Sequence, residues 1–119
     1  MGGLESKALD APEEERTFPN GSVGNVSVGG TTIGKFTFQP GWRWSESVKP
    51  IVNTDSCQNH HQGVVVAGRM HIVADDGSEI DIGAGEAYNI PPGHDAWIVG
   101  DEPFVGYEFK SAAGYAKPS

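Results

Sequence analysis

Three features are scarce in this chain of 119 residues, and each scarcity excludes a class of protein. Lys and Arg number 8 against 16 Asp and Glu, and a formal net charge of -8 repels the phosphate backbone of nucleic acids. The single cysteine, Cys57, has no second thiol for an internal disulfide, as expected in a reducing cytoplasm. No apolar run reaches the length of a membrane-spanning helix. We therefore expect a cytoplasmic protein that binds neither nucleic acid nor membrane.

Glycine and proline, by contrast, are abundant. The 17 Gly and 8 Pro favour many short strands joined by tight turns over long helices. The length suits one domain with one core. We expect polar residues 1–16 to form a flexible acidic arm, residues 17–110 the domain, and residues 111–119 a small polar tail.

The stretch from Asp55 to Trp97 predicts two β-hairpins. The β-branched run Val64–Val66 ends at Gly68, which is typical of a strand that enters a bend. Beyond it, Met70 and Ile72 alternate with Arg69, His71 and Val73, mostly at the period of a strand. These are expected to be antiparallel strands with one face in a core.

Two tryptophans follow a Pro-Gly turn at the start of another expected strand, residues 42–46. Alternation places Trp42 and Trp44 on the same, inward face, either as core filler or as the wall of a ligand pocket. Residues 47–53 are expected to form a loop. In the last strand, residues 104–109, Phe104, Gly106 and Glu108 share one face.

Residues 55–96 resemble the cupin superfamily. In the first cupin motif, two His and a Glu precede a closing Gly at fixed spacing. Counted back from Gly68, the Glu position falls on His61 and the two His positions fall on Cys57 and Asp55. The resemblance implies a small single-domain cupin: an all-β, jelly-roll β-barrel of antiparallel strands with little helix.

The second cupin motif is also present, with one change. It includes Gly85 and the turn Pro91-Pro92-Gly93, but the place of its last His is occupied by Ala96 and the nearest imidazole is His94. His94 is interpreted either as a turn residue paired with Asp95 or as a ligand or general base at the rim of the barrel.

The position of Cys57 and His61 in the first motif suggests a metal site. Thiolate and imidazole are good ligands for zinc and other borderline transition metals, here Zn, Fe, Ni or Mn. A third ligand would come from Asp55, His94 or His60, and His94 completes the set that we favour. A cupin that has lost its metal would also show these replacements, so both interpretations remain open.

Three residues are expected on the outside of the barrel. His60 should point away from His61, and His71 away from Met70 and Ile72. Trp97 should also face outward, and an exposed indole indicates burial by a second subunit. We therefore expect a homodimer, which is common among cupins.

Three functions follow from these expectations. The first is binding of a small molecule in the barrel. The second is a metal-dependent enzyme: a dioxygenase, isomerase or decarboxylase of a small organic acid. The third is a structural or interaction module without a ligand. For the first, the expected pocket lining is Trp42, Trp44, Val65, Met70, Tyr88 and Ile98, with Cys57, His61 and Arg43 or Glu46 as polar anchors.

Overall fold

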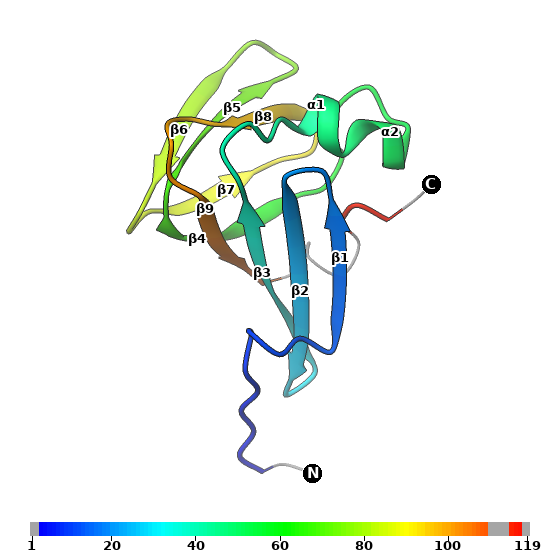
Figure 1. The fold of residues 1–119 in the computed structure, drawn as a ribbon, viewed down its shortest axis with the longest axis vertical. Coiled ribbons are helices and arrows are strands. Elements are labelled where there is room, and N and C mark those ends of the chain that lie inside the picture. The colour runs from blue at the N-terminus through cyan, green and yellow to red at the C-terminus, as the bar shows by residue number, and fades with distance from the viewer. Residues whose placement is uncertain (1–2, 110–114, 118–119) are drawn as a thin grey trace.

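The computed structural model describes residues 3–109 and 115–117. Within these residues the chain forms two antiparallel sheets and two helical turns (Figure 1). The elements in chain order are β1 Glu14–Phe18, β2 Gly21–Val28, β3 Thr31–Phe38, α1 Trp44–Ser47, α2 Lys49–Val52, β4 His61–Ala67, β5 Arg69–Ala74, β6 Glu79–Gly83, β7 Ala87–Ile90, β8 His94–Ile98 and β9 Phe104–Glu108. The prediction of an all-β barrel with little helix is confirmed.

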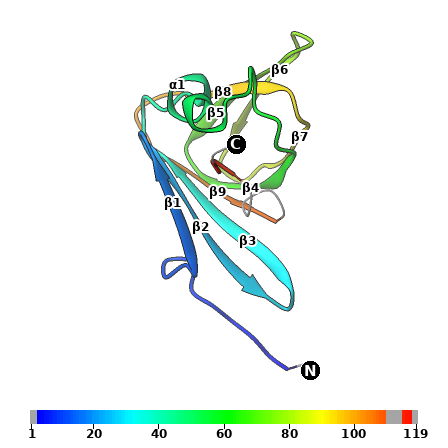
Figure 2. The ribbon, with the colours of Figure 1, turned by 90° about the vertical axis from the view of Figure 1, so that its right-hand side faces the viewer.

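The two sheets face each other around one core. The larger has the order β1-β2-β3-β9-β4-β7, and the smaller has the order β6-β5-β8. Strands β4 to β9 close into a barrel-like ring, and β1, β2 and β3 extend from it as a layer (Figure 2). The chain crosses from one sheet to the other at Gly68, between β4 and β5, with φ +83. A left-handed residue without a side chain is required at this crossing, because an added Cβ would lie 2.6 Å from the backbone of Phe104.

Alternation along each strand fills the interior. In β4, His61, Gly63 and Val65 face inward while Gln62, Val64 and Val66 face outward, as the period of a strand requires. Met70 and Ile72 of β5 are buried as expected.

After Pro40-Gly41, Arg43 is extended and forms an isolated β-bridge to Trp97, but helix α1 begins at Trp44, so the prediction of a strand at residues 42–46 was wrong from Trp44 onward. The amide of Ser47 donates to Arg43 O and that of Val48 to Trp44 O, which closes α1. Trp42 and Trp44 are both buried, at 2% exposure each, as expected, although only Trp44 belongs to the helix. The expected loop at 47–53 contains α2, which ends at Asn53 in a left-handed conformation. Among the described residues, no helix is long and apolar enough to cross a membrane.

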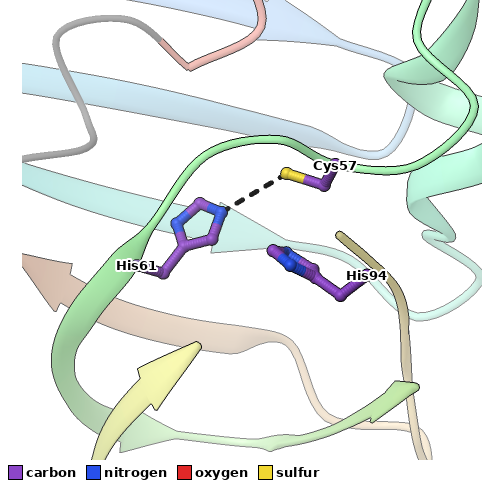
Figure 3. A group of neighbouring side chains, drawn as sticks. All are labelled: Cys57, His61 and His94. Atoms are coloured by element: carbon purple, nitrogen blue, oxygen red, sulfur yellow. Dashed lines mark hydrogen bonds between the residues drawn. The ribbon is translucent and has the colours of Figure 1, made fainter. Parts of the chain in front are cut away.

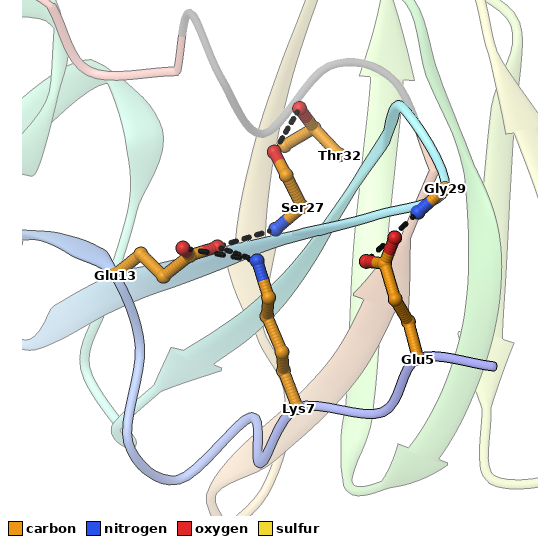
Figure 4. Close-up of polar contacts among 6 residues, drawn as sticks. All are labelled: Glu5, Lys7, Glu13, Ser27, Gly29 and Thr32. Carbon is orange, nitrogen blue, oxygen red and sulfur yellow. Dashed lines mark hydrogen bonds and ion pairs between the residues drawn. The ribbon is translucent and has the colours of Figure 1, made fainter. Parts of the chain in front are cut away.

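The polar start of the chain packs along the β2–β3 hairpin. Strand β1 begins at Glu14, so the last three residues of the expected arm belong to the sheet. Before it, Glu13 bonds the backbone N of Ser27 at 2.7 Å, and Lys7 pairs with Glu13 at 3.0 Å (Figure 4). Glu5 accepts from Gly29 N at 3.2 Å in the same view. These exposed contacts place residues 5–13 beside the sheet and contribute little stability each.

The expected C-terminal tail contains a core residue. Tyr115 is 2% exposed and Ala116 is buried, so these two positions of the expected tail lie in the core. The carbonyl of Tyr115 accepts a hydrogen bond of 3.0 Å from Arg16 Nη1 on β1. Residues 111–114 and 118–119 of that tail lie outside the described residues.

Candidate metal centre

Cys57, His61 and His94 converge inside the barrel. Their ligand atoms lie within 4.8 Å of one another, and all three side chains are buried (Figure 3). His61 begins β4 in the larger sheet and His94 begins β8 in the smaller one. Cys57 lies in the loop before β4, where its amide donates to His94 O at 2.7 Å and its carbonyl accepts from Gly93 N at 2.7 Å. These two backbone hydrogen bonds bring the thiol beside both imidazoles.

Each imidazole is oriented by an acceptor at its Nδ1 atom. Nδ1 of His61 lies 2.6 Å from Oε1 of Glu108, and Nδ1 of His94 lies 2.9 Å from the carbonyl oxygen of Pro91. A carboxylate and a carbonyl can only accept, so both rings carry a proton on Nδ1. When neutral, each ring then presents the lone pair of Nε2, which is the arrangement that metal-binding histidines usually have.

Glu108 is itself held in place. It is 5% exposed, and its second oxygen accepts a hydrogen bond of 2.7 Å from the hydroxyl of Tyr88. A buried carboxylate is costly unless it is bonded to donors, and here His61 and Tyr88 supply them. The chain Tyr88–Glu108–His61 therefore fixes the direction of the imidazole toward Cys57.

The separation of the sulfur and the first imidazole fits a shared metal ion. Cys57 Sγ lies 3.6 Å from Nε2 of His61. Bonds of about 2.3 Å to sulfur and about 2.0–2.1 Å to nitrogen in a tetrahedral site place these two atoms about 3.6 Å apart. The donor set of one thiolate and two imidazoles suits zinc, iron and nickel. It is less suited to manganese, which prefers oxygen ligands.

The surroundings of Cys57 and His61 favour a thiolate on Cys57 beside a protonated imidazole on His61. Burial raises the pKa of the Cys57 thiol, but hydrogen bonds and charge interactions with His61 and His94 outweigh it and lower the pKa. Burial lowers the pKa of His61, but the charge of Glu108 and the bonds to Cys57 and Glu108 outweigh it and raise the pKa. Deprotonated sulfur is the form that binds metals and attacks electrophiles.

The space left beside the cluster is small. The cavity has a volume of about 30 Å³, room for about one or two water molecules, whereas small-molecule pockets usually hold about 300–1,000 Å³. Four of the expected lining residues border it: Trp42, Trp44, Met70 and Tyr88. The barrel interior is therefore largely filled by side chains.

Several expected site residues lie elsewhere. Val65 and Ile98 are buried but do not border the cavity. Glu46 is exposed on α1, because a helical turn directs it away from the side on which Trp44 is buried. The side chain of Arg43 is 40% exposed and stacks over Trp97 at 4.2 Å. Neither is an anchor in the cavity.

Of the three candidates for a third ligand, the structure brings only His94 to the cluster. Asp55 is exposed, although it occupies the first His position of the motif. His60 is exposed as expected and bonds Oδ1 of Asn89 at 2.6 Å. His94 follows the turn Pro91-Pro92-Gly93 as the first residue of β8 and is 4% exposed.

Two residues of the site were missed by sequence reasoning. Glu108 shares a strand face with Phe104, and an acid on a core-facing position was a signal of a buried hydrogen-bonding role. Tyr115 also borders the cavity, with its ring 5.5 Å from that of His61. It lies outside every strand pattern, so alternation gave no signal for it.

The outer face of the smaller sheet carries His71 and Trp97, as expected. Nδ1 of His71 lies 2.5 Å from Asp81 and Nε2 lies 2.6 Å from Glu79, both on the neighbouring strand β6. Two carboxylates accept from both ring nitrogens only when the ring is protonated, and the pKa of His71 is raised by these bonds. Trp97 is partly exposed, with its ring 4.9 Å from that of His71. Homodimerisation through this face stays a prediction.

Replacing His71 with glutamine should cost a small, pH-dependent amount of stability. A raised pKa in the folded state stabilises the fold fully below the unfolded value of 6.5, and this contribution is lost as the pH rises through the folded pKa. The carboxylates are more than half exposed, so we expect no more than about 1 kcal/mol at pH 6. Urea unfolding at pH 6 and pH 9 measures it. A difference between variant and wild type that grows with pH would contradict the assignment.

Comparison with solved structures identifies the fold. A Cupin 2 conserved barrel domain protein from Salinispora arenicola matches with a TM-score of 0.62 at 19% identity, covering 94% of this chain and 92% of that one. A cupin-like protein from Thermotoga maritima matches with a TM-score of 0.52 at 17% identity, covering 77% and 68%. The chain has the cupin fold. At such low identity the likeness extends to the fold of the cupin barrel and no further.

A longer chain, that of an enzyme, also matches. Oxalate decarboxylase from Lactobacillus farciminis, in its formate complex, has a TM-score of 0.61 at 13% identity. The match covers 94% of this chain but 35% of that enzyme. No family model and no curated protein sequence matches the chain. Any activity of this cupin barrel has therefore to be argued from its own residues.

Proposed function

We propose that this cupin barrel binds one divalent transition metal ion through Cys57, His61 and His94, and that the ion serves in catalysis. The observation that carries the proposal is the convergence of a thiol and two imidazoles whose Nδ1 atoms are held by Glu108 and Pro91. Zinc and ferrous iron are the ions that this donor set suits best.

The number of ligands supports a catalytic role over a structural one. Structural zinc sites have four protein ligands, whereas catalytic sites keep one position for water or substrate. Among the described residues, three protein ligands converge here, and the adjoining cavity has room for about one or two water molecules. An ion bound there would supply Lewis acidity and would lower the pKa of a bound water.

A second candidate is a cysteine nucleophile without metal. Glu108, His61 and Cys57 form a chain of carboxylate, imidazole and thiol with contacts of 2.6 Å and 3.6 Å, which is the order of orienting group, base and nucleophile in hydrolases. The metal centre is the better candidate because it also gives a role to His94. Cys57 is also only 3% exposed. A metal ligand can be buried in this way, whereas a nucleophile has to reach its substrate directly.

Metal analysis of the wild-type protein tests the proposal. We expect close to one equivalent of transition metal after purification without chelators. Addition of Co²⁺ to metal-free protein should produce a thiolate-to-cobalt charge-transfer absorption. Its source would be Cys57, because the chain has a single thiol. Less than a tenth of an equivalent, together with no cobalt absorption, would exclude the metal centre. Rapid alkylation of Cys57 by iodoacetamide in such a sample would then favour the nucleophile.

A further inference from the structure

The ring of Tyr115 lies inside the barrel, next to the proposed metal centre. It packs edge-on against Phe36 at 4.9 Å and against His61 at 5.5 Å between ring centroids. Phe18 and Phe38 lie at 5.8 Å and 6.4 Å. The residue is 2% exposed. Aromatic rings thus surround this place on several sides, with the edge-to-face geometry that favours an aromatic occupant.

Tyr115 also separates the inner cavity from an outer groove. Trp44, Cys57 and Tyr115 border both the enclosed cavity and a groove of about 190 Å³. The groove runs between α2 and residues 115–117, with the side chains of Gln58 and Lys117 along it. Withdrawal of the Tyr115 ring would therefore open the inner cavity to this groove and leave a space of the size of a phenol.

The backbone beside Tyr115 is strained. Ala116 has φ +58, a left-handed conformation that is unfavourable for a residue with a Cβ. Withdrawal of the ring would release this strain, at the loss of the ring contacts and of the bond from Arg16 to the Tyr115 carbonyl. The tyrosine is thus held in the barrel against a local cost.

One polar group that borders the cavity has no hydrogen-bond partner among the described residues. Trp42 is 2% exposed and borders the cavity, and its indole N–H has no hydrogen-bond partner among the described residues. A buried donor without an acceptor is unfavourable, and native proteins keep few of them. The Tyr115 side chain, which is tethered to the backbone, leaves this N–H unpaired, whereas a free phenol in the same space can turn its oxygen toward it.

We propose that the barrel binds a small phenol whose ring takes the place of Tyr115, and that Tyr115 occupies this place when no ligand is bound. The inference rests on the proposed metal centre for its chemical role, because the bound ring would lie against His61. It names the class of ligand that this centre would act on.

Titration of the full-length wild-type protein with p-cresol, the side-chain analogue of tyrosine, tests the proposal. In protein with ¹³C-labelled tyrosine, the Tyr115 ring signals should move from buried to solvent-exposed positions as p-cresol binds. The signals of Tyr107, which lies on the other face of β9, should stay unchanged. Tyr115 signals that remain at their buried positions up to the solubility limit of p-cresol would overturn the proposal.

Two comparisons sharpen the test. Tyr115→Ala should bind p-cresol at least tenfold more tightly than wild type, because the ligand no longer competes with the tyrosine ring. Tyr107→Ala is the matched control and should bind like wild type. Toluene, which lacks the oxygen, should bind at least tenfold more weakly than p-cresol. Equal affinity of the wild-type protein for both compounds would overturn the assignment of a phenol.

The cobalt absorption separates this inference from the proposed function. If cobalt binds and p-cresol leaves Tyr115 in place, the phenol site is wrong and the metal centre stands. If p-cresol displaces Tyr115 but no cobalt absorption forms in the same protein, the phenol site stands and the metal centre is wrong. Each failure therefore has its own signature.

Discussion

Replacing Cys57 with serine should weaken Zn²⁺ binding by more than about a hundredfold, since even the loss of an outer hydrogen-bond partner of a metal ligand costs about 10–100-fold. The hydroxyl of serine is a poor substitute for a thiolate, and two imidazoles are too few to hold the ion. Serine has nearly the shape of cysteine, so the barrel should stay folded. Competition with a chromophoric chelator measures the affinity, and far-ultraviolet circular dichroism verifies the fold.

The matched control is His60→Ala. His60 is adjacent to His61 in sequence but is exposed and bonds Asn89, so its loss should leave the Zn²⁺ affinity unchanged. His61→Ala is a poorer probe, because it removes a donor from the buried carboxylate of Glu108 and should destabilise the fold as well. A Cys57→Ser variant that binds Zn²⁺ within threefold of wild type would show that the sulfur is not a ligand.

Replacing Gly68 with valine should lower the free energy of unfolding by at least about 3 kcal/mol, since backbone strain and overpacking each cost about 1–3 kcal/mol. The residue has φ +83, which a β-branched side chain avoids. Its Cβ would also lie 2.6 Å from the Cα of Phe104 and the carbonyl oxygen of Pro103, and backbone atoms cannot rotate away. Equilibrium unfolding in urea measures the loss.

Gly77→Val separates the two causes. Gly77 has φ +91, but an added Cβ would meet nothing within 4 Å. The free energy of unfolding of this variant should therefore fall only by the cost of placing valine in a left-handed conformation, about 1–2 kcal/mol. Equal losses in both variants would mean that the close approach of Phe104 to the crossing between the sheets has no energetic weight.

The strands were predictable because their environment has the period of the backbone. Val65, Met70 and Ile72 each occupy the buried position that alternation gives them. The convergence of Cys57 and His61 was instead expected from the resemblance to the first cupin motif, and their ligand atoms do lie close together. Local periodicity is sufficient to predict the buried positions of a strand wherever the strand has one buried face.

The remaining features depend on contacts between distant residues. Trp44 begins a helical turn and packs into the core with residues distant in sequence, which no local pattern predicts. Glu108 is satisfied by Tyr88, 20 residues away, and by His61, 47 residues away. Tyr115 is buried through packing against Phe36. Burial of this kind is decided by the assembled core, and the sequence near each residue carries little information about it.

The cluster draws His61 from one sheet and His94 from the other, with Cys57 bridging them through backbone hydrogen bonds. The three side chains are therefore neighbours only after both sheets have closed on each other. An unfolded chain has no equivalent of this arrangement, so an ion held by all three would favour the closed barrel over every earlier stage of assembly. Metal supply and the yield of mature protein would then be coupled.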